Sequence, residues 1–147
     1  MNAEAQRLHF LVVDDSQDIR DVFCRLVQRS GHVASIARDG LEAIESIQRE
    51  SFDVMLLDLS MPRMNGVEVV RWLRDHPAVA PDMRVVVVSA WTGEHRGVLQ
   101  ELGVDTVMQK PLRIEQLTDL IAEGLLGQAA PVPGTSPAGR ARDGEDR

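Results

Sequence analysis

Short apolar runs alternate along the chain with longer stretches in which apolar residues recur every three or four positions. The short runs are rich in β-branched residues and apolar along their whole length, which is typical of strands buried on both faces. They predict five strands, over residues 9–13, 32–37, 52–57, 84–89 and 104–109. Strands that alternate with helices indicate a parallel sheet covered by helices on both faces, which is a doubly wound α/β fold.

Five helices are expected between and after these strands. The first has the clearest limits, because Ser16 is in position to cap its amino end and Gly31 follows its last turn. Its apolar stripe consists of Ile19, Val22, Phe23, Leu26 and Val27. The other four are indicated by shorter apolar sets: Leu41, Ile44 and Ile47; Val67, Val70 and Leu73; Val98, Leu99 and Leu102; and Ile114, Leu117, Ile121 and Leu125.

The pattern ends near residue 126, so one domain is expected over residues 8–126. Residues 127–147 are rich in proline and glycine, and their only large aliphatic side chain is Val132. Such a segment buries too little apolar surface to offset its ordering entropy, so we expect a disordered, passive tail. The tail is too short and too polar for a DNA-binding or enzymatic domain, and no attached output domain is expected.

Composition excludes several classes of protein. The formal net charge of −7 argues against direct binding to nucleic acid. No apolar run approaches the roughly 18 residues that span a bilayer, so no membrane segment is expected. Cys24 is the only cysteine, which excludes an internal disulfide and fits a cytoplasmic location.

The carboxyl ends of the expected strands carry the candidate chemistry, because ligands of doubly wound sheets bind there. These ends hold Asp14, Asp15, Asp58, Ser89 and Lys110. Each has an ordinary explanation when taken alone, since aspartate often caps a helix or begins a turn and serine is common in turns. Independent capping does not explain why three carboxylates, a hydroxyl and the chain's single lysine all fall at strand ends.

Three neighbouring carboxylates repel one another unless a cation joins them. A hard, oxygen-preferring ion such as Mg²⁺ suits this set of donors. One carboxylate oxygen then remains free as a nucleophile, as in aspartyl-phosphate chemistry, while a hydroxyl and an ammonium bind phosphoryl oxygens. Lys110 is the only lysine beside fifteen arginines, which indicates a need for a compact point charge at this place.

Four motifs together resemble the receiver domain of bacterial two-component response regulators: VVDD (12–15), LLDLSMPRMNG (56–66), VVVVSA (85–90) and QKP (109–111). The resemblance covers the whole expected domain. It implies a flavodoxin-like sheet with strand order 2-1-3-4-5. It also implies a phosphorelay switch that assists only its own phosphorylation and dephosphorylation, and that is not otherwise an enzyme.

The resemblance implies a role for each residue of the phosphoryl site. Asp58 is the implied phosphoacceptor, which takes the phosphoryl group from a histidine kinase or a histidine phosphotransfer protein. Ser89 matches the hydroxyl that moves toward the phosphoryl group, and Lys110 matches its cationic partner. The bond from Lys110 to Pro111 is expected to be cis, a form that only X-Pro bonds adopt at low cost.

The metal site implied by the resemblance holds Mg²⁺. Asp15 is its implied direct ligand, Asp14 its water-mediated partner, and Asp58 a further ligand. The backbone carbonyl of Ser60 completes the protein ligands.

Two positions bear on how phosphorylation is sensed. Receivers usually carry an aromatic residue three positions before the lysine, where this chain has Val107. We therefore expect activation to rearrange the loop and the fourth helix directly. Trp91, two residues after Ser89, is expected either to be a partly buried aromatic that covers the loop, or to shield the aspartyl phosphate from water and sense its formation. A downstream protein target is expected on the fourth helix, fifth strand and fifth helix, unless the domain relays its phosphoryl group onward.

Two other classes of protein remain as alternatives. A haloacid-dehalogenase-type phosphatase also uses an aspartyl phosphate, but that family has a second aspartate two residues after the nucleophile, where this chain has Ser60. A flavodoxin-like binding module is disfavoured because the carboxylates would repel the phosphate of a flavin. Stoichiometric labelling by acetyl phosphate, without turnover of phosphate monoesters, distinguishes a receiver from the phosphatase.

Overall fold

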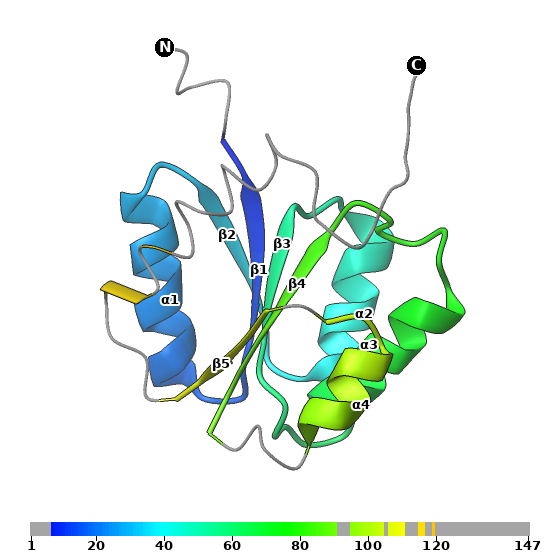
Figure 1. Cartoon of the computed structure of the whole chain (residues 1–147). Helices are drawn as coiled ribbons and strands as arrows, with labels where there is room; N and C mark the ends of the chain where they lie inside the picture. Colours follow the sequence, from blue (N-terminus) through cyan, green and yellow to red (C-terminus); the bar gives the residue numbers. More distant parts are fainter. Residues whose placement is uncertain (1–6, 91–94, 105, 111–114, 117–118, 120–147) are drawn as a thin grey trace. The chain divides into compact units, whose positions relative to one another are not determined.

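Five parallel strands form a single sheet in the order β2-β1-β3-β4-β5 (Figure 1). The computed structural model describes residues 7–90, 95–104, 106–110, 115–116 and 119. The strands are β1 (His9–Val13), β2 (Val33–Ala37), β3 (Val54–Leu57), β4 (Arg84–Ser89) and β5 (Thr106–Gln109). This confirms the doubly wound α/β fold, the five strands and their order.

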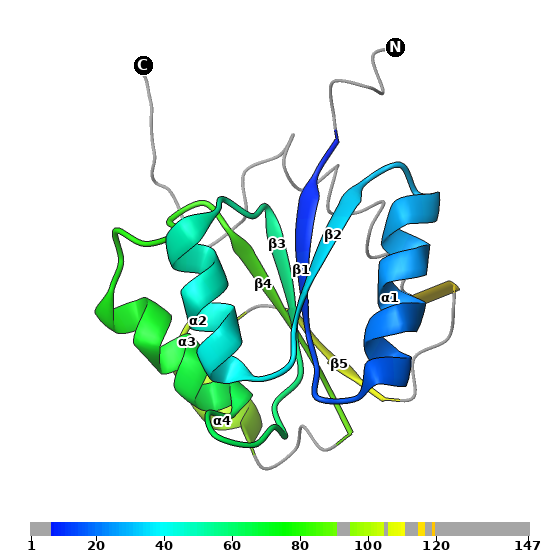
Figure 2. The same ribbon diagram turned by 180° about the vertical axis from the view of Figure 1, so that it is seen from behind.

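Four helices lie within the described residues: α1 (Gln17–Arg29), α2 (Gly40–Arg49), α3 (Gly66–Asp75) and α4 (Arg96–Glu101). In Figures 1 and 2, α1 covers one face of the sheet, and α2, α3 and α4 cover the other. The fifth helix expected near residues 114–125 falls outside the described residues, apart from three helical positions: Glu115, Gln116 and Asp119. The expected tail, residues 127–147, lies outside them as well. The chain divides into two compact units, residues 1–113 and 114–147, and the sheet and its four helices belong to the first.

Local capping explains where the first three helices begin. Ser16 caps α1, as expected, because its side chain accepts a hydrogen bond from the Ile19 N–H. Asp39 caps α2 in the same way. Asn65 caps α3 through a capping box, in which Asn65 and Glu68 each accept from the other's backbone N–H.

The first helix departs from its expected stripe in one respect. Phe23 and Val27 are buried as expected, whereas Val22 is 48% exposed. Arg20, three residues before Phe23 on the same face, is buried instead. The apolar pattern therefore placed the buried face of α1 slightly wrongly, because an arginine occupies one of its positions.

The interior strands are apolar because both of their faces are covered. Every residue of β3 is buried, and in β1 only His9 is partly exposed. Phe52 and Val104 are also buried, and they precede β3 and β5 although the expected strands included them. The edge strand β2 leaves Val33 and Ile36 largely exposed.

Strand register aligns the carboxyl ends. Val13 of β1 pairs with Leu57 of β3, so Asp14 and Asp58 follow neighbouring strands at the same level. Ser89 at the end of β4 pairs with Gln109, the residue before Lys110. The parallel topology thus carries residues from distant parts of the sequence to one edge of the sheet.

Candidate metal and phosphoryl site

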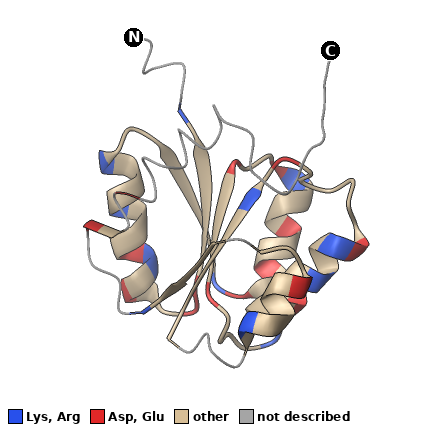
Figure 3. Cartoon of the chain, viewed as in Figure 1, with Lys and Arg blue, Asp and Glu red and all other residues tan. Residues whose placement is uncertain are grey.

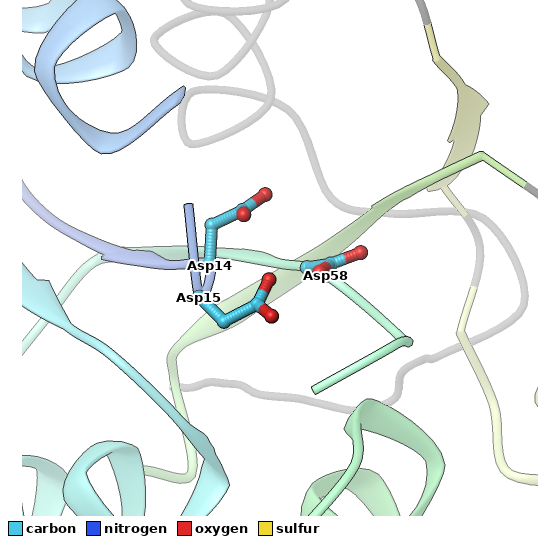
Figure 4. Close-up of side chains that lie close together, drawn as sticks. All are labelled: Asp14, Asp15 and Asp58. Atoms are coloured by element: carbon cyan, nitrogen blue, oxygen red, sulfur yellow. The ribbon is translucent and has the colours of Figure 1, made fainter. Parts of the chain in front are cut away.

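Three carboxylates converge at this edge of the sheet. Asp14, Asp15 and Asp58 each have an oxygen that lies within 4.8 Å of the others. Asp14 and Asp58 are buried, whereas Asp15 is exposed. Figure 4 shows the three side chains close together, and Figure 3 shows acidic residues in red at this end of the sheet. The sequence prediction of a single acidic cluster agrees with this geometry.

Lys110 joins the cluster from 96 residues away in the sequence. Its Nζ donates to Asp14 Oδ2 at 2.8 Å and lies 3.5 Å from Asp58 Oδ1. Its backbone N–H donates to the Ser89 carbonyl at 2.8 Å, which holds the ends of β4 and β5 together. Ser89 itself is 1% exposed. The structure therefore brings the three carboxylates and Lys110 together, with Ser89 beside Lys110.

The charges in this cluster do not balance. Three carboxylates face one ammonium, which leaves two negative charges uncompensated when all four groups are ionised. Burial and the charge of Asp14 raise the pKa of Asp58 to about 6. Burial alone would lower the pKa of Lys110, but its hydrogen bond with Asp14 and the charge of Asp58 outweigh that effect and raise it. The site thus favours an added cation and holds its lysine in the charged form.

Backbone hydrogen bonds hold the acidic loop after β1. The Asp14 carboxylate accepts from the Ser16 N–H at 2.9 Å, and the Asp14 N–H donates to the Ala37 carbonyl at 3.2 Å. The Asp14 carbonyl accepts from a guanidinium nitrogen of Arg20 at 2.8 Å. Arg20 is only 7% exposed, so a buried cation lies directly behind the acidic cluster.

Sequence reasoning missed Arg20. The signal was present, because Arg20 lies three residues before Phe23 and seven before Val27, on the buried face of α1. A charged residue at such a position is rarely buried without a partner. Nothing in the sequence names the partner, which is a backbone carbonyl of the acidic loop.

The loop after β3 turns tightly around the phosphoacceptor candidate. The Ser60 N–H donates to Asp58 Oδ1 at 3.4 Å, and the Gly66 N–H donates to the Leu59 carbonyl at 3.0 Å. A Cβ on Gly66 would lie 2.5 Å from the Asp58 carbonyl oxygen, so this position has no room for a side chain. The glycine that ends the motif LLDLSMPRMNG is therefore required by close backbone approach.

Asp15 and Ser60 open onto the same cavity, which has a volume of about 330 Å³. Its other lining residues are Leu59, Met61, Pro62, Asn65, Val67 and His95. No sequence pattern indicated His95 at this place, since histidine has no ligand spacing in this chain. The exposed side of the acidic cluster therefore borders an open cavity.

The donor set fits a magnesium ion. It consists of carboxylate oxygens, with the Ser60 backbone at the border of the same cavity, and it has an excess of negative charge. Hard cations prefer oxygen donors of this kind, and Mg²⁺ needs only one or two carboxylates when water and phosphate complete its octahedron. Among the described residues, no other group of three His, Cys, Asp or Glu side chains meets the same distance condition.

Of the two residues expected to bear on sensing and the two that form the expected cis bond, the structure describes only Val107 and Lys110. Val107 lies on β5, where it pairs with Val87 and packs, partly buried, against the core. Trp91 and Pro111 lie outside the described residues. Strand β4 separates Val107 from β3.

The fold and the site define a class of protein: a doubly wound α/β domain with an acidic cluster and a lysine at the carboxyl edge of a 2-1-3-4-5 sheet. Residues 10–122 match the family described as response regulator receiver domain. The chain belongs to this family, whose members act in two-component signalling. The family match gives the phosphatase alternative no support.

Curated relatives agree with this assignment. The chain is 32% identical over 111 residues to the response regulator MprA of Mycobacterium leprae, and 33% identical to MprA of Mycobacterium ulcerans. Both matches cover 75% of this chain and 47% of the relative. The chain therefore spans about half the length of the curated relatives it matches.

Solved structures show the same fold. A CheY-like receiver domain from Methanospirillum hungatei superposes with a TM-score of 0.76 at 26% identity, covering 84% of this chain and 97% of that one. The chemotaxis protein CheY4 of Vibrio cholerae gives 0.73 at 28% identity, covering 80% and 98%. Within the residues that the structure describes, no helix has the length and apolar character needed to cross a membrane.

Proposed function

We propose that this receiver accepts a phosphoryl group on Asp58 from a histidine kinase or a histidine phosphotransfer protein, in a Mg²⁺-dependent reaction. One observation carries the proposal: Lys110 Nζ lies within 3.5 Å of both Asp14 and Asp58, at the point where three carboxylates converge. A cluster held for stability alone would not gather three carboxylates, which outnumber the two cations beside them, Lys110 and Arg20.

Asp58 is the nucleophile in the proposed reaction. One of its carboxylate oxygens attacks phosphorus, and the nitrogen–phosphorus bond of the donor's phosphohistidine breaks. The electron pair of that bond stays on the imidazole nitrogen, which takes up a proton. Lys110 and Ser89 bind phosphoryl oxygens, and Lys110 also keeps Asp58 ionised by lowering its pKa against the effect of burial.

The proposed metal ligands are the carboxylates of Asp15 and Asp58, the backbone carbonyl of Ser60, and Asp14 through water. When bound, Mg²⁺ supplies positive charge that neutralises the phosphoryl oxygens as the bond to Asp58 forms. Asp14 suits the indirect role because its two carboxylate oxygens are engaged by Lys110 and by the Ser16 N–H. Asp15 suits the direct role because it is exposed to the cavity.

Phosphorylation is proposed to change the conformation of the face formed by α4, β5 and the fifth helix. A downstream protein target is proposed to bind this face. The alternative is that the domain relays its phosphoryl group onward. Ser89 moves toward the phosphoryl group. Val107 has no aromatic ring to turn inward, so the β4–α4 loop and α4 move directly, with Trp91 covering the phosphate. The Lys110–Pro111 bond is proposed to be cis. The domain assists only its own phosphorylation and dephosphorylation. Its proposed location is the cytoplasm.

Labelling of Asp58 tests the proposal. The protein and its Asp58→Asn variant are incubated with Mg²⁺ and radiolabelled acetyl phosphate, and with a phosphorylated histidine kinase. We expect stoichiometric, alkali-labile label in the wild type, none in Asp58→Asn, and no turnover of phosphate monoesters. Asp75→Asn, which changes an exposed acid at the end of α3, is the matched control and is expected to label normally. Normal labelling of Asp58→Asn would refute the site assignment.

A further inference from the structure

The carboxyl end of β2 supplies no acid, hydroxyl or lysine to the site, yet it touches both loops of the acidic cluster. The Ala37 carbonyl accepts from the Asp14 N–H at 3.2 Å, which ties it to the loop after β1. The Gly40 N–H donates to the Met64 carbonyl at 3.1 Å, which ties it to the loop after β3. Residues 37–40 therefore bridge the two loops that carry the proposed metal ligands.

The bridge to the second loop is closed by an ion pair. Arg63 donates from Nε to Asp39 Oδ2 at 2.8 Å, and one of its terminal nitrogens lies 2.5 Å from the same oxygen. Asp39 is 6% exposed, and its other oxygen accepts from the Glu42 N–H as the cap of α2. Charge-assisted bonds to a buried carboxylate are among the stronger polar contacts. Asp39 thus anchors Arg63 to the rigid start of a helix.

The backbone of this loop is unusual at the same residue. Arg63 has a φ of 66°, in the left-handed region that glycine adopts at little cost and arginine does not. A Cβ on Gly40 would overlap the Met64 carbonyl oxygen, so the two chain segments touch backbone to backbone. Arg63, three residues after Ser60, therefore combines this backbone conformation with a side chain that pairs with Asp39.

We propose that the Arg63–Asp39 ion pair is a positioning device for the metal side of the site. It holds the loop Ser60–Asn65 against the start of α2, and so fixes the distance from the Ser60 backbone to the acidic loop that Ala37 holds. Arg63 has no described contact with the acidic cluster and acts through the loop. This inference rests on the proposed function, because the loop position matters only if Mg²⁺ binds at the cluster.

The sign of one measurement separates positioning from plain electrostatics. Arg63 carries a positive charge near an acidic site, so removing that charge would tighten cation binding if charge alone mattered. Removing it would weaken cation binding if the loop loses its position. Asp39→Asn has the opposite electrostatic effect but the same positioning effect, and asparagine still caps the helix. Both variants are therefore expected to weaken Mg²⁺ binding.

The test is a MgCl₂ titration of the full chain. The NMR chemical shifts of the Asp15 and Ser60 amides report Mg²⁺ binding. We expect Mg²⁺ to bind about 10-fold more weakly to Arg63→Gln, which is the lower end of the range for removing a group that bonds a metal ligand directly. The double variant with Asp39→Asn is expected to bind Mg²⁺ no more weakly than Asp39→Asn alone, since both substitutions remove the same contact. At saturating Mg²⁺, labelling by acetyl phosphate is expected to return to the wild-type rate.

Arg38→Gln is the matched control. Arg38 is the neighbour of Asp39, and its exposed side chain pairs with Glu42 and has no described contact with the loop after β3. Its removal changes the charge by the same amount and is expected to leave the Mg²⁺ affinity unchanged or slightly tighter. Arg63→Gly removes the ion pair and also relieves the left-handed backbone conformation. This variant is expected to bind Mg²⁺ more weakly as well. It replaces Arg63→Gln in the test if Arg63→Gln does not fold.

Two outcomes are distinguishable. If the wild type binds Mg²⁺ and labels on Asp58 while Arg63→Gln or Arg63→Gly binds Mg²⁺ as tightly or more tightly, the positioning inference is wrong and the proposed function stands. If the wild type binds no Mg²⁺ at the cluster, the proposed function fails and the inference fails with it.

Discussion

Asp58 is expected to destabilise the metal-free protein at neutral pH. Its pKa rises from an ordinary value of 3.8 to about 6, first because it is buried and second because Asp14 is nearby. A raised acid pKa means that the folded state holds the proton more tightly than the unfolded chain. Stability from this group is therefore greatest below about pH 4 and falls as the pH rises toward 6.

The size of this effect follows from the shift. About two pKa units at roughly 1.4 kcal/mol each give a loss on the order of 3 kcal/mol above pH 6. Asp58→Asn removes the charge and keeps the shape, so the variant is expected to be more stable than the wild type at pH 7.5 by about 2–3 kcal/mol. The difference should shrink toward zero at and below about pH 4, where Asp58 becomes protonated in both states.

Urea denaturation followed by circular dichroism measures both free energies, between about pH 4 and 7.5, in the presence of EDTA. Asp75→Asn controls for the loss of an exposed carboxylate and is expected to have little effect at any pH. Added Mg²⁺ should stabilise the wild type and not Asp58→Asn, because the ion binds only the native state of the intact cluster. Equal stability at the upper pH, or a gap that persists undiminished at the lower pH, would refute the reasoning.

Two further predictions concern residues around the site. Arg20→Met is expected to lower the free energy of unfolding by about 1–3 kcal/mol, because the Asp14 carbonyl loses its buried hydrogen-bond donor. Arg25→Met, at an exposed position on the same helix, is the control and should change this free energy little. Unchanged stability of Arg20→Met in a urea titration would show that this hydrogen bond contributes nothing. Gly97→Ala is expected to stabilise the protein by roughly 0.5–1 kcal/mol, since a Cβ at Gly97 meets no atom within 4 Å and alanine favours the helix. Amide hydrogen exchange in α4 measures this directly and is expected to be slower in the variant, whereas faster exchange would contradict the prediction.

Much of the fold followed from local pattern. Each of the five strands lies inside an expected range, because a strand covered on both faces must be apolar along its length. The strand order came from the resemblance carried by the four motifs, since apolar runs do not say which strands are neighbours. The stripe of α1 was less reliable, because Arg20 is buried where the apolar pattern had suggested Val22.

The candidate site was predictable for a related reason. In a parallel sheet all carboxyl ends meet at one edge, so the residues after each strand are neighbours whatever their separation in sequence. That rule predicts that Asp14, Asp58 and Lys110 lie together. Their detailed contacts were not predictable, because side-chain geometry depends on strand register and loop shape.

The sequence by itself determined the five strands, the four described helices, the acidic edge of the sheet and the residue types that carry the proposed chemistry, since these depend on local periodicity and on position along each strand. Only the tertiary structure decided that Arg20 lies beneath the acidic loop and that Arg63 reaches Asp39 across 24 residues of sequence. Contacts of this kind join loops whose paths are set by packing and backbone hydrogen bonds, so no local pattern in the chain encodes them.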